Sequence, residues 1–458
     1  MSKNFSYFMK DTNNISCTIG GILKVTVPLV LTALSANLMF VSDRMILAYY
    51  SIDAMNAVGI SSVMVAIMSY MFISIACTAE IYVGQYNGSQ QIDNLAKPAW
   101  QMIYLSLLAN IIFIPMGIFS QHLNMLPEYY KVDGIAYQSL LSYFCCFPCL
   151  TAAVSSFFIG QGKTAIITMI VFGGNVLNII LSIILIFGIE GIIPSLGCIG
   201  AAVGTITSEV TQFIVLFALF LRKSARRQFN TLKCRRFDKE IFRGCLKIGA
   251  PMSIGRLFEL GAWYLIYVVL SHVSKEMATV QGILTNIFVL FAFFQEGLGK
   301  GISTLSANFI GMKNLEGIRR LLKIFVILTI VVGGIISIPL IIFPKLIFKL
   351  LINIAGDEIL SLYPIIKTGF PLMVLSIVFE TLGVILWGIL MSGGDTKYPL
   401  VANLSCLWAV VVIPTIVMYY NNTLNNIIVW KLCIIWAVLS LFFIYKRYKS
   451  LKWYKKLV

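Results

Sequence analysis

The sequence predicts an all-α integral membrane protein of about twelve transmembrane helices, arranged as two pseudo-symmetric six-helix bundles. Three observations carry this prediction: the scarcity of charge, the length of the apolar runs and the placement of the basic residues. Of the 458 residues, 59% are hydrophobic and only 12% are charged, whereas soluble domains average about 25% charged residues. So few charges cannot cover the surface of a water-soluble protein of this size, so soluble and disordered chains are excluded.

The apolar runs are long enough to cross a membrane. Runs such as 166–188 and 321–343 carry at most one charge, and about 20 such residues span a hydrocarbon core of about 30 Å as a helix. The expected spans are 22–48, 57–84, 98–120, 135–160, 164–187, 198–221, 248–271, 280–308, 321–343, 368–391, 398–419 and 427–445. The longest polar connection predicts an N-lobe at 1–221, a basic cytoplasmic linker at 222–247 and a C-lobe at 248–458.

The basic residues gather in alternate loops. With the N-terminus placed in the cytoplasm, the cytoplasmic segments hold 26 of the 35 lysines and arginines, the external segments hold 6, and Arg44, Arg256 and Lys300 lie in spans. This distribution is the positive-inside pattern. We therefore expect a multi-pass protein of the cell (inner or plasma) membrane with both termini cytoplasmic, which requires an even number of spans.

The two halves repeat one another. Three glycines recur with one common offset of 223 residues, and each half holds an even number of spans. The matched pairs are Gly21 with Gly244, Gly59 with Gly282 and Gly88 with Gly311. The repeat is therefore parallel, and such halves commonly form two bundles that exchange access to a site by rocking.

Several other functions are excluded by what the chain lacks. The net charge of +16 follows from membrane topology, so no nucleic-acid partner is expected. The segment Gly160–Thr164 resembles the end of a phosphate loop, but Phe157 stands where that motif requires glycine. The Cys146–Cys149 pair lies inside a span without a second ligand pair, which favours buried small hydrophobic residues over a zinc site. We expect no enzyme activity.

Six acidic residues fall inside the expected spans, and they are Asp43, Glu80, Glu209, Glu259, Glu296 and Glu380. A charge at mid-bilayer costs at least about 2.5–3.5 kcal/mol, so such residues usually face a cavity, pair with a base or carry protons and cations.

A structural ion pair is one interpretation of two of these acids. Glu259 follows Arg256 by three residues, and Glu296 precedes Lys300 by four, so each pair shares a helix face. A structural role is also favoured for Glu80, near a cytoplasmic span end. A functional role is favoured for Asp43 and Glu380.

Buried carboxyls suit exchange transport because of how they titrate. Burial favours the neutral form of a carboxyl, which can then hold a proton, or release it and attract a cation. One group that serves both ligands at different times is the minimum apparatus for antiport.

The order and spacing of several motifs resemble those of the multidrug and toxic compound extrusion (MATE) family, of the MOP flippase superfamily. The resemblance covers nearly the whole chain. The matching elements are Val41–Arg44, Gly84–Gly88, the N-x-x-x-D-like element from Asn178, Gly200–Ala202, Phe258–Glu259, and Glu380 twelve residues before Ser392–Gly394.

The resemblance implies two bundles forming a V-shaped cavity, and export of cationic small molecules against H⁺ or Na⁺. Carried over by position, Asp43, Asn178 and Thr205 line an N-lobe cation site. Glu259 and Glu380 line a C-lobe site, with Arg256, Glu296 and Lys300 as possible ion-pair or cavity residues. The resemblance implies no cofactor beyond the coupling ion and no metal other than Na⁺ at these sites. The expected partners are the lipid bilayer and a cationic substrate, and the chain is expected to be a monomer.

One residue departs from the family pattern. The element from Asn178 ends at Ser182, where the family has a second carboxylate. A Na⁺ site requires several hard oxygen ligands, and the serine removes a charged one, so Ser182 favours proton coupling in the N-lobe. In the C-lobe, Glu259 and Glu380 could still bind Na⁺, so Na⁺ coupling stays an alternative there.

Two other function classes stay open. A lipid-linked oligosaccharide flippase of the same superfamily would line its cavity with several bases to hold a pyrophosphate, yet the spans hold six acids against three bases when Lys24, Lys323 and Lys431, near span ends, are counted with the loops. A membrane-embedded transferase would need a nucleophile or an acid–base cluster at a membrane face, and none is visible. Export of a cation is the favoured interpretation.

Overall fold

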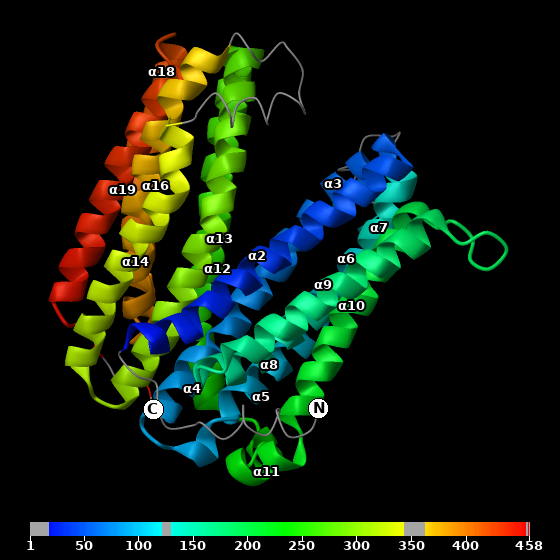
Figure 1. The fold of residues 1–458 in the computed structure, drawn as a ribbon, viewed down its shortest axis with the longest axis vertical. Helices are drawn as coiled ribbons and strands as arrows, with labels where there is room; N and C mark the ends of the chain where they lie inside the picture. Colours follow the sequence, from blue (N-terminus) through cyan, green and yellow to red (C-terminus); the bar gives the residue numbers. More distant parts are fainter. Residues whose placement is uncertain (1–17, 121–129, 343–361, 455–456, 458) are drawn as a thin grey trace. The chain divides into compact units, whose positions relative to one another are not determined.

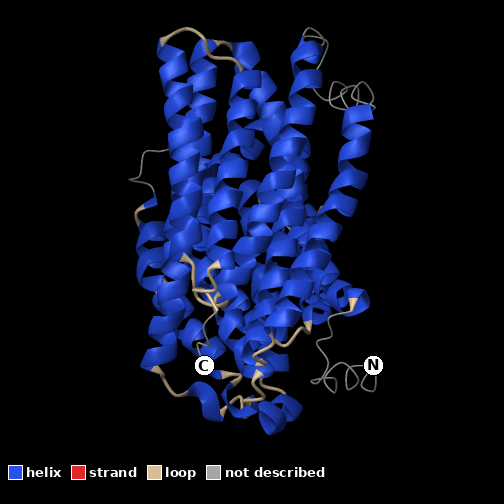
Figure 2. Ribbon diagram, turned by 90° about the vertical axis from the view of Figure 1, so that its left-hand side faces the viewer, coloured by secondary structure: helices blue, strands red, loops and turns tan. Residues whose placement is uncertain are grey.

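The computed structural model describes residues 18–120, 130–342, 362–454 and 457. Within them the chain is helical, with short loops between the helices and a single isolated β-bridge in place of any strand (Figure 2). Ten of the described helices are long and apolar enough to cross a membrane. The all-α membrane fold predicted from composition and apolar runs is therefore confirmed.

The chain forms two compact units. Unit 1 comprises residues 1–253, 307–313 and 456–458, and unit 2 comprises 254–306 and 314–455. The N-lobe, linker and C-lobe bounds expected from the sequence stay a prediction.

Unit 1 contains most of the helices from the first half of the chain (Figure 1). They are α2 (Ile19–Tyr50), α3 (Ile52–Cys77), α4 (Ala79–Gly88), α5 (Lys97–Leu108), α6 (Asn110–Ile118), α7 (Lys131–Phe144), α8 (Cys146–Gly160), α9 (Thr164–Phe187), α10 (Gly197–Phe220) and α11 (Lys223–Phe229). The beginning of α12 (Lys239–Val273) and the end of α13 (Lys275–Gly311) also belong to it.

Unit 2 contains the rest of α12 and α13 and the helices that follow. These are α14 (Leu315–Ile342), α16 (Tyr363–Ser392), α17 (Lys397–Leu407), α18 (Ile413–Tyr420) and α19 (Asn426–Lys449), with a π-helical turn, Trp408–Val412, between α17 and α18. Its core is apolar and aromatic, and buried Trp430 and Trp436 of α19 pack around Trp263 of α12.

Polar side chains join α2 to α9 in unit 1. Thr168 donates to the carbonyl of Pro28 at 2.7 Å, Thr164 donates to the carbonyl of Val25 at 2.9 Å, and Asn175 donates to the carbonyl of Ser35 at 2.6 Å. Hydroxyl and amide groups join helices in this way inside membranes, where no water competes for them. The bonds fix the register between α2 and α9.

Two small residues let α10 approach α9 closely, and the two helices run side by side in Figure 1. A Cβ added at Gly200 would lie 2.5 Å from the carbonyl oxygen of Leu185, and one at Gly204 would lie 2.9 Å from the hydroxyl of Ser182. This G-x-x-x-G spacing is typical of tight helix pairs in membranes.

The segment expected as a linker is partly helical. It contains α11, and α12 begins at Lys239, inside the predicted linker. Ala225 and Phe229 of α11 are buried, whereas Arg226 and Arg227 are exposed. The linker is therefore a packed element of unit 1 with a basic outer face.

Candidate functional site

The first candidate site surrounds the carboxyl group of Asp43 on α2. Ser182 on α9 donates its hydroxyl hydrogen to Oδ1 at 3.0 Å, and Thr205 on α10 donates to Oδ2 at 3.0 Å. Asp43 is 5% exposed and Ser182 is fully buried. Neutral donors from two neighbouring helices thus hold both carboxyl oxygens.

Asn178 on α9 adds a third polar side chain and leaves one oxygen without a partner. Its Nδ2 lies 3.3 Å from Thr205 Oγ1 and 3.5 Å from Ser182 Oγ. The residue is fully buried, and its Oδ1 accepts no hydrogen bond from any described residue. A buried acceptor without a donor is costly, so this oxygen is suited to accept from a proton-bearing group or to bind a cation.

The base next to Asp43 in sequence does not pair with it. Arg44 is exposed, and its Nη2 donates to the carbonyl oxygen of Gly59 at 3.4 Å. Adjacent residues on a helix do not face one another. The Asp43 carboxyl is therefore bonded by neutral groups.

We call the group of Asp43, Asn178, Ser182 and Thr205 the Asp43 site. It brings together the three residues that the family resemblance implied for an N-lobe cation site, and their role in coupling stays a prediction. Ser182 entered the sequence argument only as a departure from the family pattern, yet it bonds Asp43 directly. The signal for this contact was its spacing of four residues from Asn178, which places both on one helix face.

A second acid lies in the same interior as the Asp43 site. Glu209 on α10 follows Thr205 by four residues and is half-buried. Its charge and that of Asp43 repel each other. The sequence marked Glu209 as an intramembrane acid but gave it no role.

Unit 2 holds a second candidate site, a charge cluster of Arg256, Glu259, Glu296, Lys300 and Glu380. Two ion pairs form within single helices: Arg256 Nη1 lies 3.0 Å from Glu259 Oε2, and Lys300 Nζ lies 2.9 Å from Glu296 Oε1. The Arg256 side chain is 64% exposed and that of Glu259 18%. Arg256 is therefore the more exposed side chain of this ion pair.

Glu380 on α16 joins this cluster from a third helix. Arg256 attracts Glu259, Glu296 and Glu380, whereas Glu259 repels Glu380. Glu380 Oε2 is buried and has no hydrogen-bond partner among the described residues. On the neighbouring α13, Gln295 Nε2 donates to Thr381 Oγ1 at 2.9 Å, which holds α13 against α16 beside the acid.

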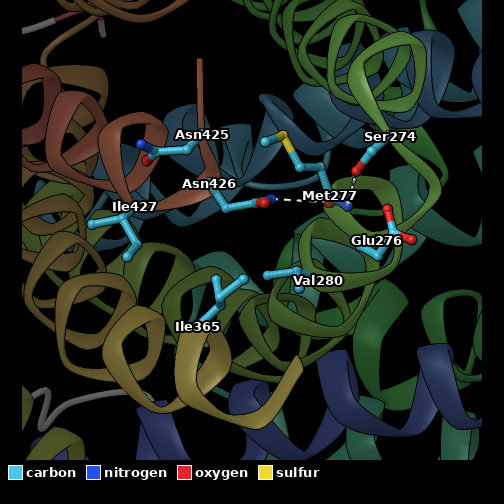
Figure 3. Close-up of a pocket in the computed structure, with 8 residues that line it drawn as sticks. All are labelled: Ser274, Glu276, Met277, Val280, Ile365, Asn425, Asn426 and Ile427. Carbon is cyan, nitrogen blue, oxygen red and sulfur yellow. Dashed lines mark hydrogen bonds between the residues drawn. The ribbon is translucent and has the colours of Figure 1, made fainter. Parts of the chain in front are cut away.

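A cavity of about 340 Å³ lies elsewhere in unit 2 (Figure 3). Ser274 between α12 and α13, the first turns of α13 and α16, and the start of α19 line it. Asn426 donates to the carbonyl of Met277 at 3.0 Å, and Asn425 caps α19 by accepting from the backbone of Ile428. Structural hydrogen bonds thus engage both asparagines, and no candidate coupling residue lines this cavity.

Within the described ranges, no three His, Cys, Asp or Glu side chains gather in a way that would hold a metal ion. Cys146 and Cys149 are free thiols.

Long apolar helices with carboxyls buried among them define the class of multi-pass membrane transporters. A family profile described as MatE matches residues 28–184 and 251–418, which is most of the chain. The chain belongs to this family, as the sequence resemblance predicted. Because its members are transporters, the expectation of a transporter instead of an enzyme is confirmed as well.

The chain is similar to curated proteins along almost all of its length. It is 24% identical over 428 residues to the "Probable multidrug resistance protein YoeA" of Bacillus subtilis (strain 168), covering 89% of this chain and 88% of that protein. It is 25% identical over 409 residues to the "Probable multidrug resistance protein NorM" of Thermotoga maritima, covering 84% of this chain and 83% of that protein.

The fold is also that of solved transporters. A MOP superfamily transporter from Pyrococcus furiosus aligns with a TM-score of 0.82 at 16% identity, covering 94% of this chain and 95% of that one. At this identity the likeness shows the fold alone.

Proposed function

We propose that this protein is a secondary active antiporter that exports cationic, amphiphilic small molecules in exchange for protons by alternating access. The observation that carries the proposal is the Asp43 carboxyl, buried within a membrane helix and bonded by neutral donors. The names of the relatives, which include two probable multidrug resistance proteins, support the substrate class.

The mechanism follows from competition for one carboxyl. Deprotonated, Asp43 is an anion in a medium of low dielectric and attracts a cation strongly. Protonated, it is neutral, and the cation loses its partner. A proton that enters from one side thus displaces a substrate cation, which couples the two gradients.

The composition of the Asp43 site supports the proton over Na⁺ as its coupling ion. Hard cations take several oxygen ligands, and binding strengthens with the number of charged ones. Here Ser182 supplies a hydroxyl that already donates to Asp43. The site offers one carboxylate and one free amide oxygen, on Asn178, and a proton needs no more than this.

The acids of unit 2 give a second route for a cation. Glu380 has a buried oxygen without a hydrogen-bond partner in the described structure, which a proton or Na⁺ would satisfy. We propose that Glu380 is the coupling carboxyl of this unit, with Glu259 as its acidic neighbour.

A flippase of pyrophosphate lipids is not favoured by the arrangement of the bases. Such a substrate needs free cationic side chains, whereas Arg256 and Lys300 are each ion-paired to an acid on their own helix. Export of a cation uses the surplus of acids directly.

Dye efflux from vesicles tests the proposal. We expect the protein to export a cationic dye under a pH gradient without Na⁺, and we expect Asp43→Asn and Glu380→Gln to insert normally but lose coupled export. If efflux requires Na⁺ and ignores the pH gradient, proton coupling is wrong. If Glu380→Gln exports at the wild-type rate, that carboxyl is not a coupling group.

We also propose an inner-membrane location with both termini cytoplasmic, because of the basic bias of the expected cytoplasmic loops. The N-terminal residues 1–17 lie outside the described structure. A single cysteine placed at Lys452 in a cysteine-less background is expected to resist an impermeant thiol reagent added to intact cells. Labelling from outside would refute the orientation.

A further inference from the structure

Glu209 lies on the face of α10 that builds the Asp43 site. Thr205 donates to Asp43 Oδ2 at 3.0 Å, and Glu209 follows it by four residues, one helical turn along the same face. The side chain of Glu209 is half-buried, and it makes no hydrogen bond or ion pair with any residue in the described ranges. A carboxyl in this setting has no structural bond to explain it.

The groups that interact electrostatically with Glu209 are one acid, one phenol and three thiols. Asp43 of α2 acts on it directly. Tyr137 of α7, which is 3% exposed, interacts electrostatically with the carboxyls of Asp43 and Glu209. The thiols of Cys145, at the junction of α7 and α8, and of Cys146 and Cys149 in α8 also interact with it. One base, Arg44, acts within this interior: it reaches Tyr137 electrostatically but bonds the carbonyl of Gly59.

Two like charges in one interior without a base paired to either cannot both persist without a ligand, because their repulsion is strong at low dielectric. Protons on both carboxyls, or a cation between the two anions, remove it. An independent observation points to the same ligand: fully buried Asn178, whose Nδ2 bonds Thr205 and Ser182, has an Oδ1 without a partner among the described residues. That acceptor needs a proton-bearing group or a cation beside it.

We propose that Glu209 is a second coupling carboxyl, which supplies from α10 the negative charge that Ser182 does not supply from α9. Exchange at the Asp43 site then takes two protons for each monovalent organic cation, apart from any proton that Glu380 of unit 2 carries. The inference rests on the proposed antiport function and adds a residue and a stoichiometry to it.

The test measures the proton stoichiometry in proteoliposomes. Ethidium, a permanent cation, is the probe; the membrane potential is clamped at zero, Na⁺ is absent, and the pH gradient is one unit. Two protons per ethidium sustain an ethidium ratio of about 100-fold at zero net flux, and one proton sustains about 10-fold, because one pH unit is worth one decade per proton. We expect the ratio sustained by Glu209→Gln to be about tenfold lower than that of the wild type, because the variant loses one proton and Glu380 is the same in both.

Two control variants isolate the charge of Glu209. Glu209→Asp keeps the carboxyl and is expected to keep the wild-type ratio. Glu190→Gln makes the same chemical change at an exposed acid of the α9–α10 loop and is also expected to keep it.

Proton release on ethidium binding is a second measurement, which applies even if Glu209→Gln binds ethidium without transporting it. In lightly buffered detergent solution, ethidium binding to the wild type is expected to release one proton more than binding to Glu209→Gln. Equal release, or an unchanged zero-flux ratio, would overturn the assignment of Glu209. A wild type that moves no ethidium under the pH gradient would instead refute the antiport proposal itself, so the two failures are distinguishable.

Discussion

Replacement of Gly88 by alanine is expected to break a close helix contact inside unit 1. A Cβ at Gly88 would lie 2.0 Å from the backbone oxygen of Asn308, at the end of α13, and 2.8 Å from its carbonyl carbon. Real Cβ contacts essentially never fall below 3.0 Å. The obstacle is backbone, so α4 and the end of α13 would have to separate by about 1 Å, since a main chain cannot rotate aside as a side chain can.

The cost of that separation can be worked from the local bonds. Asn87 Nδ2 donates to Asn308 Oδ1 at 2.7 Å, and Asn308 Nδ2 donates to the carbonyl of Gly160 at 2.9 Å. Overpacking costs about 1–3 kcal/mol, and each weakened buried hydrogen bond adds about 1 kcal/mol. With both bonds weakened, the expected loss for Gly88→Ala is therefore about 3–5 kcal/mol.

The repeat supplies a matched control. Gly59, another glycine of the internal repeat, has nothing within 4 Å of an added Cβ. Gly59→Ala is expected to be neutral or stabilising by up to about 1 kcal/mol, because alanine favours helix over glycine. Gly311, the repeat partner of Gly88, would bring a Cβ 2.3 Å from the carbonyl of Gln85, so Gly311→Ala should match Gly88→Ala.

Thermal unfolding in detergent, followed by a thiol-reactive fluorophore, is the assay. It suits this chain because buried free cysteines such as Cys149 and Cys245 become reactive only on unfolding. We expect a melting temperature clearly below wild type for Gly88→Ala and unchanged or higher for Gly59→Ala. Equal melting temperatures for the two variants would refute the packing argument.

Three further predictions concern charge. The Arg256→Ala/Glu259→Ala double-mutant cycle, measured by thermal unfolding, should give a coupling energy below about 1 kcal/mol, because the Arg256 side chain is exposed. A coupling energy of about 3 kcal/mol or more would show a desolvated ion pair and refute this prediction. Burial lowers the pKa of Lys163, in the α8–α9 turn, to about 8, which is below its value in the unfolded state. The unfolded state therefore binds more protons between about pH 8 and 10.4, so stability rises with pH through that window. Lys163→Met should raise the melting temperature at pH 7 and remove this rise of stability with pH, and a persistent rise would contradict the prediction. Ser182→Asp should add a carboxylate beside Asp43 and make dye efflux respond to a Na⁺ gradient, and indifference to Na⁺ would count against the role assigned to Ser182.

The membrane fold could be predicted because its signals are local. Apolar runs of span length report burial in lipid residue by residue, without knowledge of the neighbouring helices. The start of α12 at Lys239 and the packing of α11 could not be predicted from the same signal. Both segments are polar, and buried Phe229 takes part in the packing through contacts with residues remote in sequence, such as Phe157.

The candidate sites divide in the same way. The Arg256–Glu259 and Glu296–Lys300 pairs follow from spacing within one helix, so the sequence alone indicates them. The surroundings of Glu380 depend on α13 and α12 beside α16, and no pattern within α16 contains that information.

The Asp43 site shows how backbone packing constrains the placement of charge. Gly204 lets α10 approach so closely that a Cβ there would lie 2.9 Å from Ser182 Oγ, and at this separation Ser182 donates to Asp43. A carboxylate at position 182 would be an acceptor facing an acceptor unless a proton or cation lay between them. A hydroxyl removes that requirement and holds Asp43 in place without a ligand. On our proposal, the second negative charge lies instead one turn further along α10, at Glu209, where partial exposure lowers the cost of the ionised form and a proton can come and go.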